Sequence, residues 1–448
     1  AEAIATGKTA AGRNYADLRV TPSDDGISLR IEATDSRDPV RNFNVWMPDW
    51  QGQRFAGQRW QPGADFSPFH PLFLERLELT DWRNHDRLVA EFASERVLLL
   101  GANAQGKTSI LEAIASLATA RSPFVRRDAE VVRFGTDQAI IRSVVRRQGR
   151  PTAVDLLFRA HGKRAAQIDG MPCQRMLDWL GTVTNVMFSR VDLDLVHGPP
   201  SSRREFLDRM LRQMAPLFHD EESRFSRLLV QRNALIRKMQ AGEAGVAELE
   251  AWDPSFAAAG AAVMRRRALL ARRLGPRAAH WLAFLSGSRE QLELVYRSGM
   301  SGVENPDPEH PEAWLEAMRD ALLRARRQDL ARGHATTGPQ RDDLVVRLDG
   351  RDAATFASTG QRRSLVLALK LAERDLLADS LGEPPLLLLD DVLAELDSAR
   401  QDALLEAIGD DVQTFVTSTH LSEVQGGWMR RADIRLVSPG GLAQPSSP

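Results

Sequence analysis

The sequence predicts an α/β fold, and three observations support this. An apolar run at Val97–Leu100 leads into a glycine-rich loop and then into an apolar stretch with helical periodicity. Four leucines at residues 386–389 form a second buried strand, which ends in two carboxylates. Between these segments, residues 200–332 carry apolar side chains at helical intervals. Strands and helices are therefore both expected around a loop that is suited to phosphate.

The composition predicts a soluble protein of several domains. At 448 residues the chain is too long for one ordinary core, and two or three domains are expected. The 59 basic and 60 acidic residues give a net charge of −1, so contact with a polyanion would need a local basic patch. The single cysteine, Cys173, permits no internal disulfide, and no apolar stretch approaches the roughly 18 residues of a membrane span. We expect a cytoplasmic protein without membrane contact.

Residues 1–70 differ in character from the rest and are treated as an unassigned extension. Two runs, residues 26–33 and 42–50, have strand-like patterns, which predicts an extension that is β-rich or disordered. The tripeptide Gly-Lys-Thr occurs here at Lys8, but Glu2 stands where a phosphate loop needs its first glycine, and no strand precedes it. This copy is therefore not expected to bind phosphate.

Alternating apolar residues predict a series of strands after residue 70. The strand-like runs are residues 72–82, 86–92, 96–100, 139–147, 152–160 and 165–172. The last run contains Asp169-Gly170, a pair typical of tight hairpin turns, so it is expected to fold back on itself.

The glycine-rich loop has the spacing G-x-x-x-x-G-K-[ST]. Gly101 and Gly106 allow backbone N–H groups to converge on an anion, and the helix that follows directs its N-terminus at the same point. Lys107 adds a mobile positive charge and is one of only five lysines among 59 basic residues. We interpret the segment as a phosphate-binding loop.

The helical block carries a local basic excess. Residues 201–280 contain 15 Arg or Lys and 9 Asp or Glu. The forked guanidinium group of arginine suits phosphate recognition, yet runs of basic residues are more often solvated helix faces. Composition therefore leaves open whether this block contacts nucleic acid.

Two carboxylates follow the leucine strand. A carboxylate at this position holds Mg²⁺ in phosphate-loop proteins, so Asp390 is expected to act with the Thr108 hydroxyl. Asp391 would then orient or deprotonate an attacking water. Alone, the pair could be a polar strand end. Together with the phosphate loop it predicts a magnesium site.

A second anion site is suggested by small and polar residues before a long amphipathic helix, at residues 356–377. Ser358 and Gly360 could present a hydroxyl and backbone N–H groups at the helix N-terminus. One nucleotide rarely needs two such sites, which favours a head-to-tail dimer in which this loop covers the γ-phosphate of the other subunit. The alternative is an ordinary Ser/Thr N-cap.

The order of these motifs resembles that of the SMC-like class of ABC-type ATPases. The stretches that carry this resemblance are residues 101–114, 358–373 and 386–397. Further stretches, at residues 74–85, 195–211, 231–239 and 335–344, resemble more narrowly the RecF family of bacterial recombination mediators. The resemblance covers about residues 71–440 and implies an ATPase head made from residues 71–198 and 333–440, an inserted mostly helical lobe at 199–332, and a tail at 441–448.

The resemblance also implies roles for individual residues. Those implied to hold the ATP phosphates are Gly101, Asn103, Gly106, Lys107, Thr108 and Ser109. Thr108 and Asp390 are implied to bind Mg²⁺, and Lys107, Asp391 and His420 to serve catalysis. Ser358, Gly360, Gln361 and the D-loop Asp397 are implied to reach across an ATP-induced homodimer. The implied function is binding of double-stranded DNA near single-strand gaps and ss/dsDNA junctions, and loading of RecA with RecO and RecR.

Some positions depart from the wider pattern. Residue 104 is Ala where many relatives have Gly, which is tolerable if its φ stays negative. Asp391 stands where transporter ATPases carry Glu, and its shorter side chain predicts slow hydrolysis. Residues 190–192 lack the usual Pro-Glu-Asp, so contacts from that loop are in doubt. The other functions considered are an ABC-transporter ATPase subunit, a small-molecule kinase, and a nucleotide-binding scaffold without hydrolysis.

Overall fold

The structure is a computed structural model of the 448-residue chain. It describes residues 17–22, 28–35, 38–46, 71–125, 127–396, 398–409, 412–421, 428, 431–438 and 441–443. For residues 17–46, and for Glu395, Ser398 and Ala399, only the backbone is described. Lys8 and Asp397 lie outside the described residues.

A six-stranded sheet joins the two ends of the ATPase-like region. Its order is β11 (Asn185–Phe188), β15 (Leu386–Leu389), β16 (Thr414–Ser418), β6 (Arg96–Leu100), β17 (Asp433–Ser438) and β18 (Gly441–Ala443). All neighbouring pairs are parallel except β17 and β18. Both faces of this sheet are covered, so the four leucines of β15 and all five residues of β16 are buried. The predicted α/β fold built from both ends of the chain is confirmed.

A second sheet is antiparallel and comes from the N-terminal half alone. Its order is β10 (Met171–Pro172), β9 (Ala165–Ile168), β8 (Arg150–Arg159), β7 (Gln138–Arg147), β4 (Phe73–Trp82) and β5 (His85–Glu91). Alternate residues of β4 and β7 are buried, as expected for a sheet with one covered face. The predicted hairpin is confirmed, since Asp169 and Gly170 both adopt positive φ between β9 and β10.

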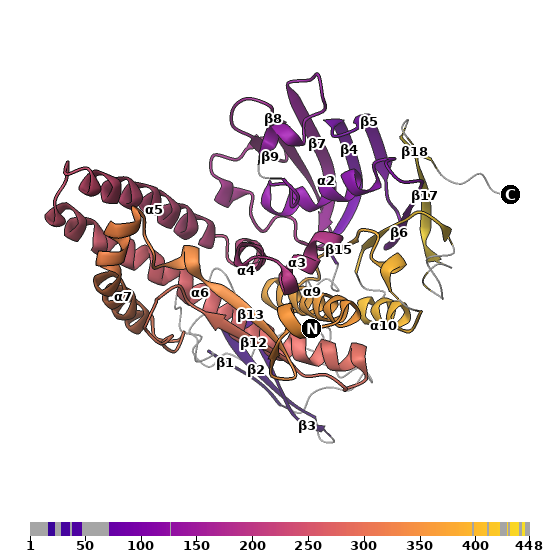
Figure 1. Cartoon of the computed structure of the whole chain (residues 1–448). Helices are drawn as coiled ribbons and strands as arrows, with labels where there is room; N and C mark the ends of the chain where they lie inside the picture. The colour runs from indigo at the N-terminus through magenta and orange to yellow at the C-terminus, as the bar shows by residue number, and fades with distance from the viewer. Residues whose placement is uncertain are drawn as a thin grey trace.

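Helix α2 (Lys107–Thr119) lies between the two sheets (Figure 1). Its apolar residues share one core with Leu386 and Leu388 of β15 and with strand β4. Leu387 and Leu389 point to the opposite face, where they pack in a core with α9 (Thr359–Leu381) and α10 (Ser398–Ile408). The period of two in a strand thus places β15 between two helical layers.

The lobe between the two halves of the head is built around one long helix, α6 (Figure 1). Its helices are α3 (Asp194–His197), α4 (Pro200–Met214), α5 (Phe218–Gln240), α6 (Val246–Ser286) and α7 (Pro311–Arg332). Both α5 and α7 pack against α6, and α6 also runs along α9 of the head.

One segment of the block expected to be helical is a strand. Residues Leu292–Arg297 form β12, which pairs antiparallel with β13 (Asp343–Leu348), and β13 pairs with β14 (Arg351–Asp352). The sequence "LELVYR" contains β-branched and aromatic residues, which favour a strand. Its partner β13 follows the helical block in the sequence and provides an edge with which β12 can pair.

Short helical turns complete the described part of the chain. They are η1 (Asp128–Glu130), η2 (Met176–Asp178), η3 (Arg190–Leu193), η4 (Pro339–Arg341), α8 (Ala353–Phe356) and η5 (Leu393–Glu395). None of the helices in the described ranges is both long and apolar enough to cross a membrane.

The N-terminal extension contains a three-stranded antiparallel sheet. Its strands, in order, are β1 (Asp17–Pro22), β2 (Ser28–Asp35) and β3 (Asp38–Trp46). Within the strand patterns predicted at residues 26–33 and 42–50, residues 28–33 lie in β2 and residues 42–46 lie in β3, while residues 26–27 and 47–50 lie outside the described residues. Strand β1 was not predicted.

Candidate nucleotide-binding site

The phosphate-binding loop connects β6 to α2 at the carboxyl edge of the parallel sheet. Gly106 caps α2 without a side-chain hydrogen bond, so the first N–H groups of the helix stay available to an anion. Lys107 Nζ donates to the carbonyl oxygens of Gly101 at 2.6 Å and Ala102 at 3.1 Å. The lysine therefore folds back over the loop, where its charge faces the space that a phosphate would enter.

Both motif glycines are required by close neighbours. A Cβ on Gly101 would lie 2.6 Å from the carbonyl oxygen of Val437 in β17. A Cβ on Gly106, whose φ is 98°, would lie 2.4 Å from His85 Nε2 and 2.7 Å from Asn84 Nδ2. The loop is thus held between β17 and the turn at residues 83–85, and a side chain at either glycine would displace it.

Ala104 does not meet the condition that the sequence suggested for it. Its φ is 64°, in the left-handed region. The loop needs this conformation to turn its backbone between Asn103 and Gly106, and alanine adopts it at a cost of roughly 1 kcal/mol. Alanine is therefore strained at this position, because loop closure, not residue preference, sets the angle.

Thr108 and Asp390 meet where a metal ion would bind. Thr108 Oγ1 donates to Asp390 Oδ1 at 2.9 Å, although the residues are 282 positions apart. Thr417 Oγ1 donates to the same oxygen at 2.9 Å and accepts a bond from the Asp391 N–H at 2.8 Å. A hydroxyl and a carboxylate that converge in this way are hard oxygen donors of the kind Mg²⁺ prefers.

The environment of Asp390 affects its protonation. Burial raises the pKa of Asp390 above its ordinary value, and hydrogen bonds from Thr108 and Thr417 oppose this shift. Because a metal ion binds only the deprotonated carboxylate, its affinity should fall as the pH falls through this raised pKa. Loss of metal binding is then expected at a higher pH than for an exposed aspartate.

Asp391 stands at the mouth of the site. It is partly exposed and has a φ of 53°, a conformation that aspartate tolerates better than most residues. Its backbone N–H is fixed by Thr417, and its side chain lines the same cleft as Lys107 and Thr108. The carboxylate is thus placed beside the phosphate loop but not locked by an ion pair to Lys107.

A cleft that is open to solvent lies above the phosphate-binding loop. Besides the loop and Asp391, it is lined by Arg83 and Asn84 on one side and by Glu130 and Val132 on another. The two sides are joined, since Trp82 forms a β-bridge with Val132. These lining residues were not assigned from the sequence, although "WRNH" lies within a stretch that carried the family resemblance.

The turn at residues 83–85 is fixed to α2 by polar contacts. Arg83 makes a bidentate pair with Glu112, with N···O distances of 2.7 and 2.5 Å. Trp82 Nε1 donates to the carbonyl of Ser109 at 2.8 Å. Burial lowers the pKa of His85, so its neutral ring can donate through Nε2 to the Gly106 carbonyl, at 3.2 Å. The turn at residues 83–85 therefore holds the phosphate-binding loop in place.

The residues predicted to contact a second subunit lie at the N-terminus of α9, outside this cleft. Ser358 caps α9 by accepting from the Gln361 N–H at 3.3 Å, and Gln361 Oε1 accepts from the Ser358 N–H at 2.8 Å. A Cβ on Gly360 would meet nothing nearer than Arg400, at 3.7 Å. The N-cap that the sequence allowed as an alternative is present, and it leaves Gly360 open.

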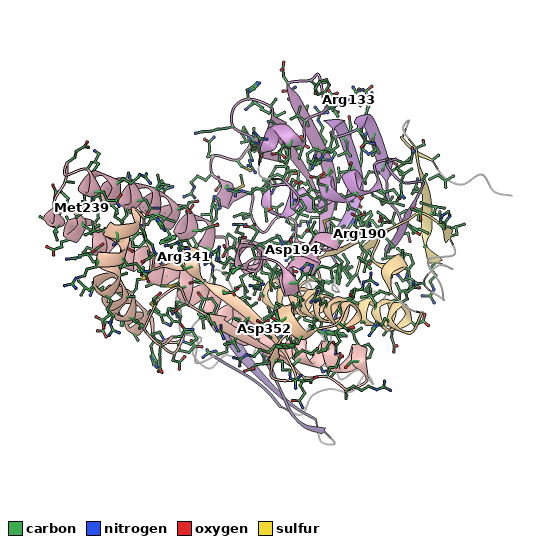
Figure 2. All side chains as sticks on the ribbon, viewed as in Figure 1. Arg133, Arg190, Asp194, Met239, Arg341 and Asp352 are labelled. Carbon is green, nitrogen blue, oxygen red and sulfur yellow. The ribbon has the colours of Figure 1, made fainter. Side chains whose placement is uncertain are left out.

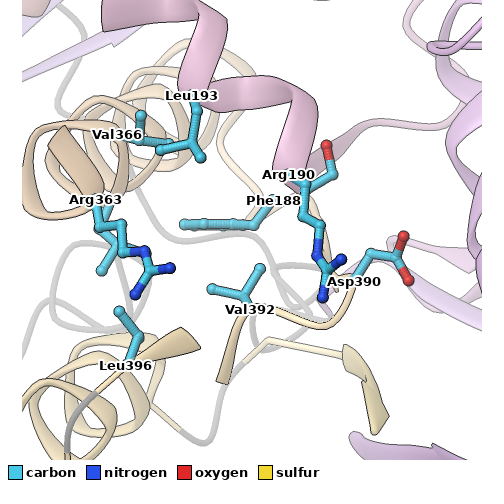
Figure 3. A pocket seen from close by; sticks show the side chains of 10 residues that line it. Phe188, Arg190, Leu193, Arg363, Val366, Asp390, Val392 and Leu396 are labelled. Carbon is cyan, nitrogen blue, oxygen red and sulfur yellow. The ribbon is translucent and has the colours of Figure 1, made fainter. Parts of the chain in front are cut away.

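A smaller hollow lies between α9 and the end of β15 (Figure 3). The guanidinium groups of Arg190, from η3, and Arg363, from α9, project toward it, while the Asp390 carboxylate points away. Its other walls are mostly apolar and include Phe188 and Val392. The loop at residues 190–192, whose contacts were in doubt, therefore borders the space between Asp390 and α9.

His420 lies at the same sheet edge as the phosphate loop. It follows β16, whose Ser418 pairs with Leu100 of β6, and its N–H donates to Ser418 Oγ at 3.2 Å. The structure thus brings together the phosphate loop, Asp390 and Asp391, and it places His420 at the same edge of the sheet but not among the residues that line the cleft. Ser358, Gly360 and Gln361 lie apart from this cleft. Asp397 falls outside the described residues.

Comparisons with known proteins agree with this geometry. The chain is 42% identical over 375 residues to the DNA replication and repair protein RecF of Synechococcus sp. (strain JA-3-3Ab), which covers 83% of this chain and 98% of that protein. It is 40% identical over 378 residues to RecF of Gloeobacter violaceus (strain ATCC 29082 / PCC 7421), with 84% and 100% covered. No protein-family model matches the chain.

Solved structures show the same similarity. Those of the recombination mediator proteins RecF-ATPrS and RecF-ATP in the RecFOR pathway each match with a TM-score of 0.77 and 27% sequence identity. The match covers 84% of this chain and 99% of each of those chains. The head and the helical lobe therefore share one fold with these proteins.

Proposed function

Because the chain belongs to the RecF family of DNA replication and repair proteins, we propose that it is an ATP-dependent DNA clamp. In this proposal it binds double-stranded DNA near single-strand gaps and promotes RecA loading with RecO and RecR. The observation that carries the proposal is the Thr108–Asp390 hydrogen bond of 2.9 Å beside Lys107. It joins the two motifs that a Mg·ATP site requires. The RecFOR pathway named for the similar structures supports the choice of partners.

The phosphates of ATP would be held by the loop before α2. The N–H groups of residues 103–109, including those of Asn103 and Ser109, lie at the start of the helix, where the helix dipole favours negative charge. Lys107 would exchange the carbonyls of Gly101 and Ala102 for the β- and γ-phosphates. The adenosine would extend over the wall formed by Arg83, Asn84 and Val132.

Thr108 and Asp390 would hold Mg²⁺. The described residues contain no cluster of three or more His, Cys, Asp or Glu side chains that could hold a metal ion. This fits Mg²⁺, which is usually bound by one or two protein oxygens together with phosphate and water. When bound, it would neutralise charge on the β- and γ-phosphates. Thr417 keeps Asp390 oriented, because its hydroxyl bonds the same carboxylate oxygen.

Asp391 would orient the attacking water, with His420 beside it at the sheet edge. The Asp391 backbone is fixed by Thr417, so its carboxylate can reach only a short distance into the cleft. A glutamate would reach one methylene further. We therefore expect a turnover well below about 10 s⁻¹, the median of enzymes, which suits a switch more than a motor.

A second subunit would complete the site. Ser358, Gly360 and Gln361 lie outside the chain's own cleft, so in a head-to-tail dimer they would face the γ-phosphate bound by the other subunit. The open space beside Gly360 supports this arrangement, since no neighbour in its own chain requires glycine there. Asp397 is assigned to the same interface on the family pattern alone.

Sedimentation of three proteins tests this proposal. Wild type, Lys107→Ala and Asp391→Asn are compared with and without Mg·ATP and a gapped duplex, at one fixed salt concentration because phosphate contacts depend on salt. Wild type should dimerise with ATP and then retain the duplex, whereas Lys107→Ala should do neither. Asp391→Asn should dimerise but lose at least tenfold in ATP turnover, about 1.4 kcal/mol in the barrier.

Two other outcomes would be decisive. If wild type remains monomeric with ATP and ignores the duplex, the clamp function is wrong even though the fold stands. If Asp391→Asn leaves the turnover unchanged while ATP still drives dimerisation, the chain is a nucleotide-binding scaffold and Asp391 has no catalytic role.

A further inference from the structure

The exposed face of α5 carries a row of cations. Arg224, Arg227 and Lys238 are all exposed, and Gln231, also exposed, lies between them on the same face. From residue 224 to 238 the helix rises about 21 Å, at roughly 1.5 Å per residue. In Figure 2 the row ends beside Met239, at the tip of the lobe farthest from the head.

These cations differ from most others in the lobe because they have no acidic partner. The side chains of Arg224, Arg227 and Lys238 make no hydrogen bond or ion pair with any residue that the structure describes. Other lobe arginines are neutralised in pairs, namely Arg212 with Glu205 and Glu222, Arg232 with Asp329, Arg266 with Glu221, Arg267 with Asp208 and Asp342, and Arg272 with Asp307. Arg224, Arg227 and Lys238 thus form a row of cations on α5 that no acidic side chain of the described residues neutralises.

The sequence around the row keeps it free of negative charge. Residues 223–242 contain no Asp or Glu, although the first turns of α5 are acidic. The helix dipole explains a cation in the last turn, such as Lys238, but its influence is confined to the ends of the helix. Arg224 and Arg227 lie further inside α5, so a different reason is needed for them.

Arg121 extends the row toward the head. It is exposed, and its charge acts on His219 and Glu222 at the start of α5, which places it close to that end of the row. Arg121 directly follows α2, the helix whose N-terminus forms part of the phosphate loop. The row therefore runs from the far end of the nucleotide-binding helix to the tip of the lobe.

We propose that this row, Arg121, Arg224, Arg227 and Lys238, binds the phosphate backbone of duplex DNA, an assignment that rests on the proposed function. Arginine and lysine neutralise backbone phosphates, and Gln231 adds a neutral donor of the kind that also contacts them. A protein partner would need an apolar centre with aromatic anchors. Beside the row, α5 exposes one large apolar side chain, Val230, and its two phenylalanines, Phe218 and Phe225, are buried. The length of the row suits contact with several successive phosphates of one DNA strand.

A double variant, Arg224→Gln with Arg227→Gln, tests the row. Binding of a gapped duplex is measured by fluorescence anisotropy with Mg·ATP over a series of salt concentrations. Loss of two phosphate contacts should weaken binding at least about tenfold near 100 mM salt and lower the slope of log K against log salt by about 1.8, or about 0.9 per phosphate. ATP affinity, ATP-induced dimerisation and the melting temperature should stay at wild-type values.

The matched control is Arg319→Gln with Arg327→Gln on α7. These arginines are also exposed and have no ion pair among the described residues, but they share their helix face with Glu312, Glu316 and Asp320. The control should bind DNA as wild type does. Equal losses in both variants, or no loss in the α5 variant, would overturn the assignment. Failure of wild type to bind DNA would instead overturn the proposed function.

Discussion

The two helix N-termini that could bind phosphate, those of α2 and α9, are built in opposite ways. At α2, Gly106 provides no side-chain cap, and the nearest atoms of His85 and Asn84 leave no room for a Cβ. At α9, Ser358 and Gln361 cap each other, and the space around Gly360 is open. The N-terminus of α2 is enclosed by side chains of its own chain. The N-terminus of α9 is capped by side chains of its own chain but remains exposed.

This difference indicates which part of the site each terminus supplies. An N-terminus without a cap keeps its N–H groups for a ligand, and the turn at residues 83–85 holds it rigid from below. A capped terminus with an open glycine needs no ligand to be stable, yet it lets another surface approach closely. The α2 terminus is therefore suited to bind phosphate within one chain, and under the proposed dimer the α9 terminus would act only when a second subunit binds.

The largest effect is expected from Gly106→Ala. The methyl group would lie 2.4 Å from His85 Nε2 and would hold alanine at a φ of 98°, so the loop must move. Strain of this kind costs roughly 1–3 kcal/mol, and displaced N–H groups would no longer converge on phosphate. We expect ATP affinity to fall at least about 100-fold, equivalent to about 2.7 kcal/mol, as measured by titration calorimetry.

Gly287→Ala is the control for Gly106→Ala. Gly287 also has a positive φ, 65°, but nothing lies within 4 Å of its Cβ position, at the end of α6. This variant should lose about 1 kcal/mol of unfolding free energy and keep its ATP affinity. If Gly106→Ala bound ATP as well as Gly287→Ala does, the α2 terminus would not be enclosed in the way described.

A smaller and more selective effect is expected from Gly360→Asp. An acidic residue in the first turn of α9 favours the helix by about 0.3–1 kcal/mol, so the monomer should be as stable as wild type. It would also repel the γ-phosphate bound by the other subunit. Sedimentation should show wild-type ATP affinity but dimerisation weakened at least about tenfold, or about 1.4 kcal/mol.

Gly360→Ala separates charge from size in this experiment. Alanine also favours the helix, and its methyl group would meet only Arg400 at 3.7 Å, so it should reduce dimerisation much less than aspartate does. Normal dimerisation of the aspartate variant would show that α9 does not face a phosphate, and the two termini would then have unrelated roles.

The sequence was sufficient for the strands and motifs that local pattern encodes. The leucines of β15, the glycine spacing before α2 and the Asp-Gly turn at residues 169–170 were all predicted from short windows. The site as a whole was not, because its contacts join distant segments. Thr417 bonds Asp390 across neighbouring strands, and the turn at residues 83–85 lies below Gly106 only after the two sheets pack around α2.

Local preference failed where tertiary packing decided the outcome. Strand β12 was hidden in a block of helical composition because its partner, β13, comes after that block. Alanine at position 104 is free of strain only at a negative φ, yet the phosphate loop holds it at 64°.

The smallest effect, and the finest measure of how rigid the α2 terminus is, is expected from Ala104→Gly. Glycine is unstrained at a left-handed φ, so the substitution removes a penalty of roughly 1 kcal/mol from the folded state. It also adds conformational freedom to the unfolded chain, which opposes this gain. The free energy of unfolding should therefore rise by less than about 1 kcal/mol in denaturant titration. ATP affinity should change by less than about fivefold. Gln148→Gly, at a φ of 48° in an exposed turn far from the loop in sequence, should give the same change in stability without any change in ATP affinity. A larger loss of ATP affinity in Ala104→Gly than in Gln148→Gly would mean that Ala104 itself stiffens the phosphate-binding loop. The rigidity of the α2 N-terminus would then come partly from Ala104 and partly from the turn at residues 83–85.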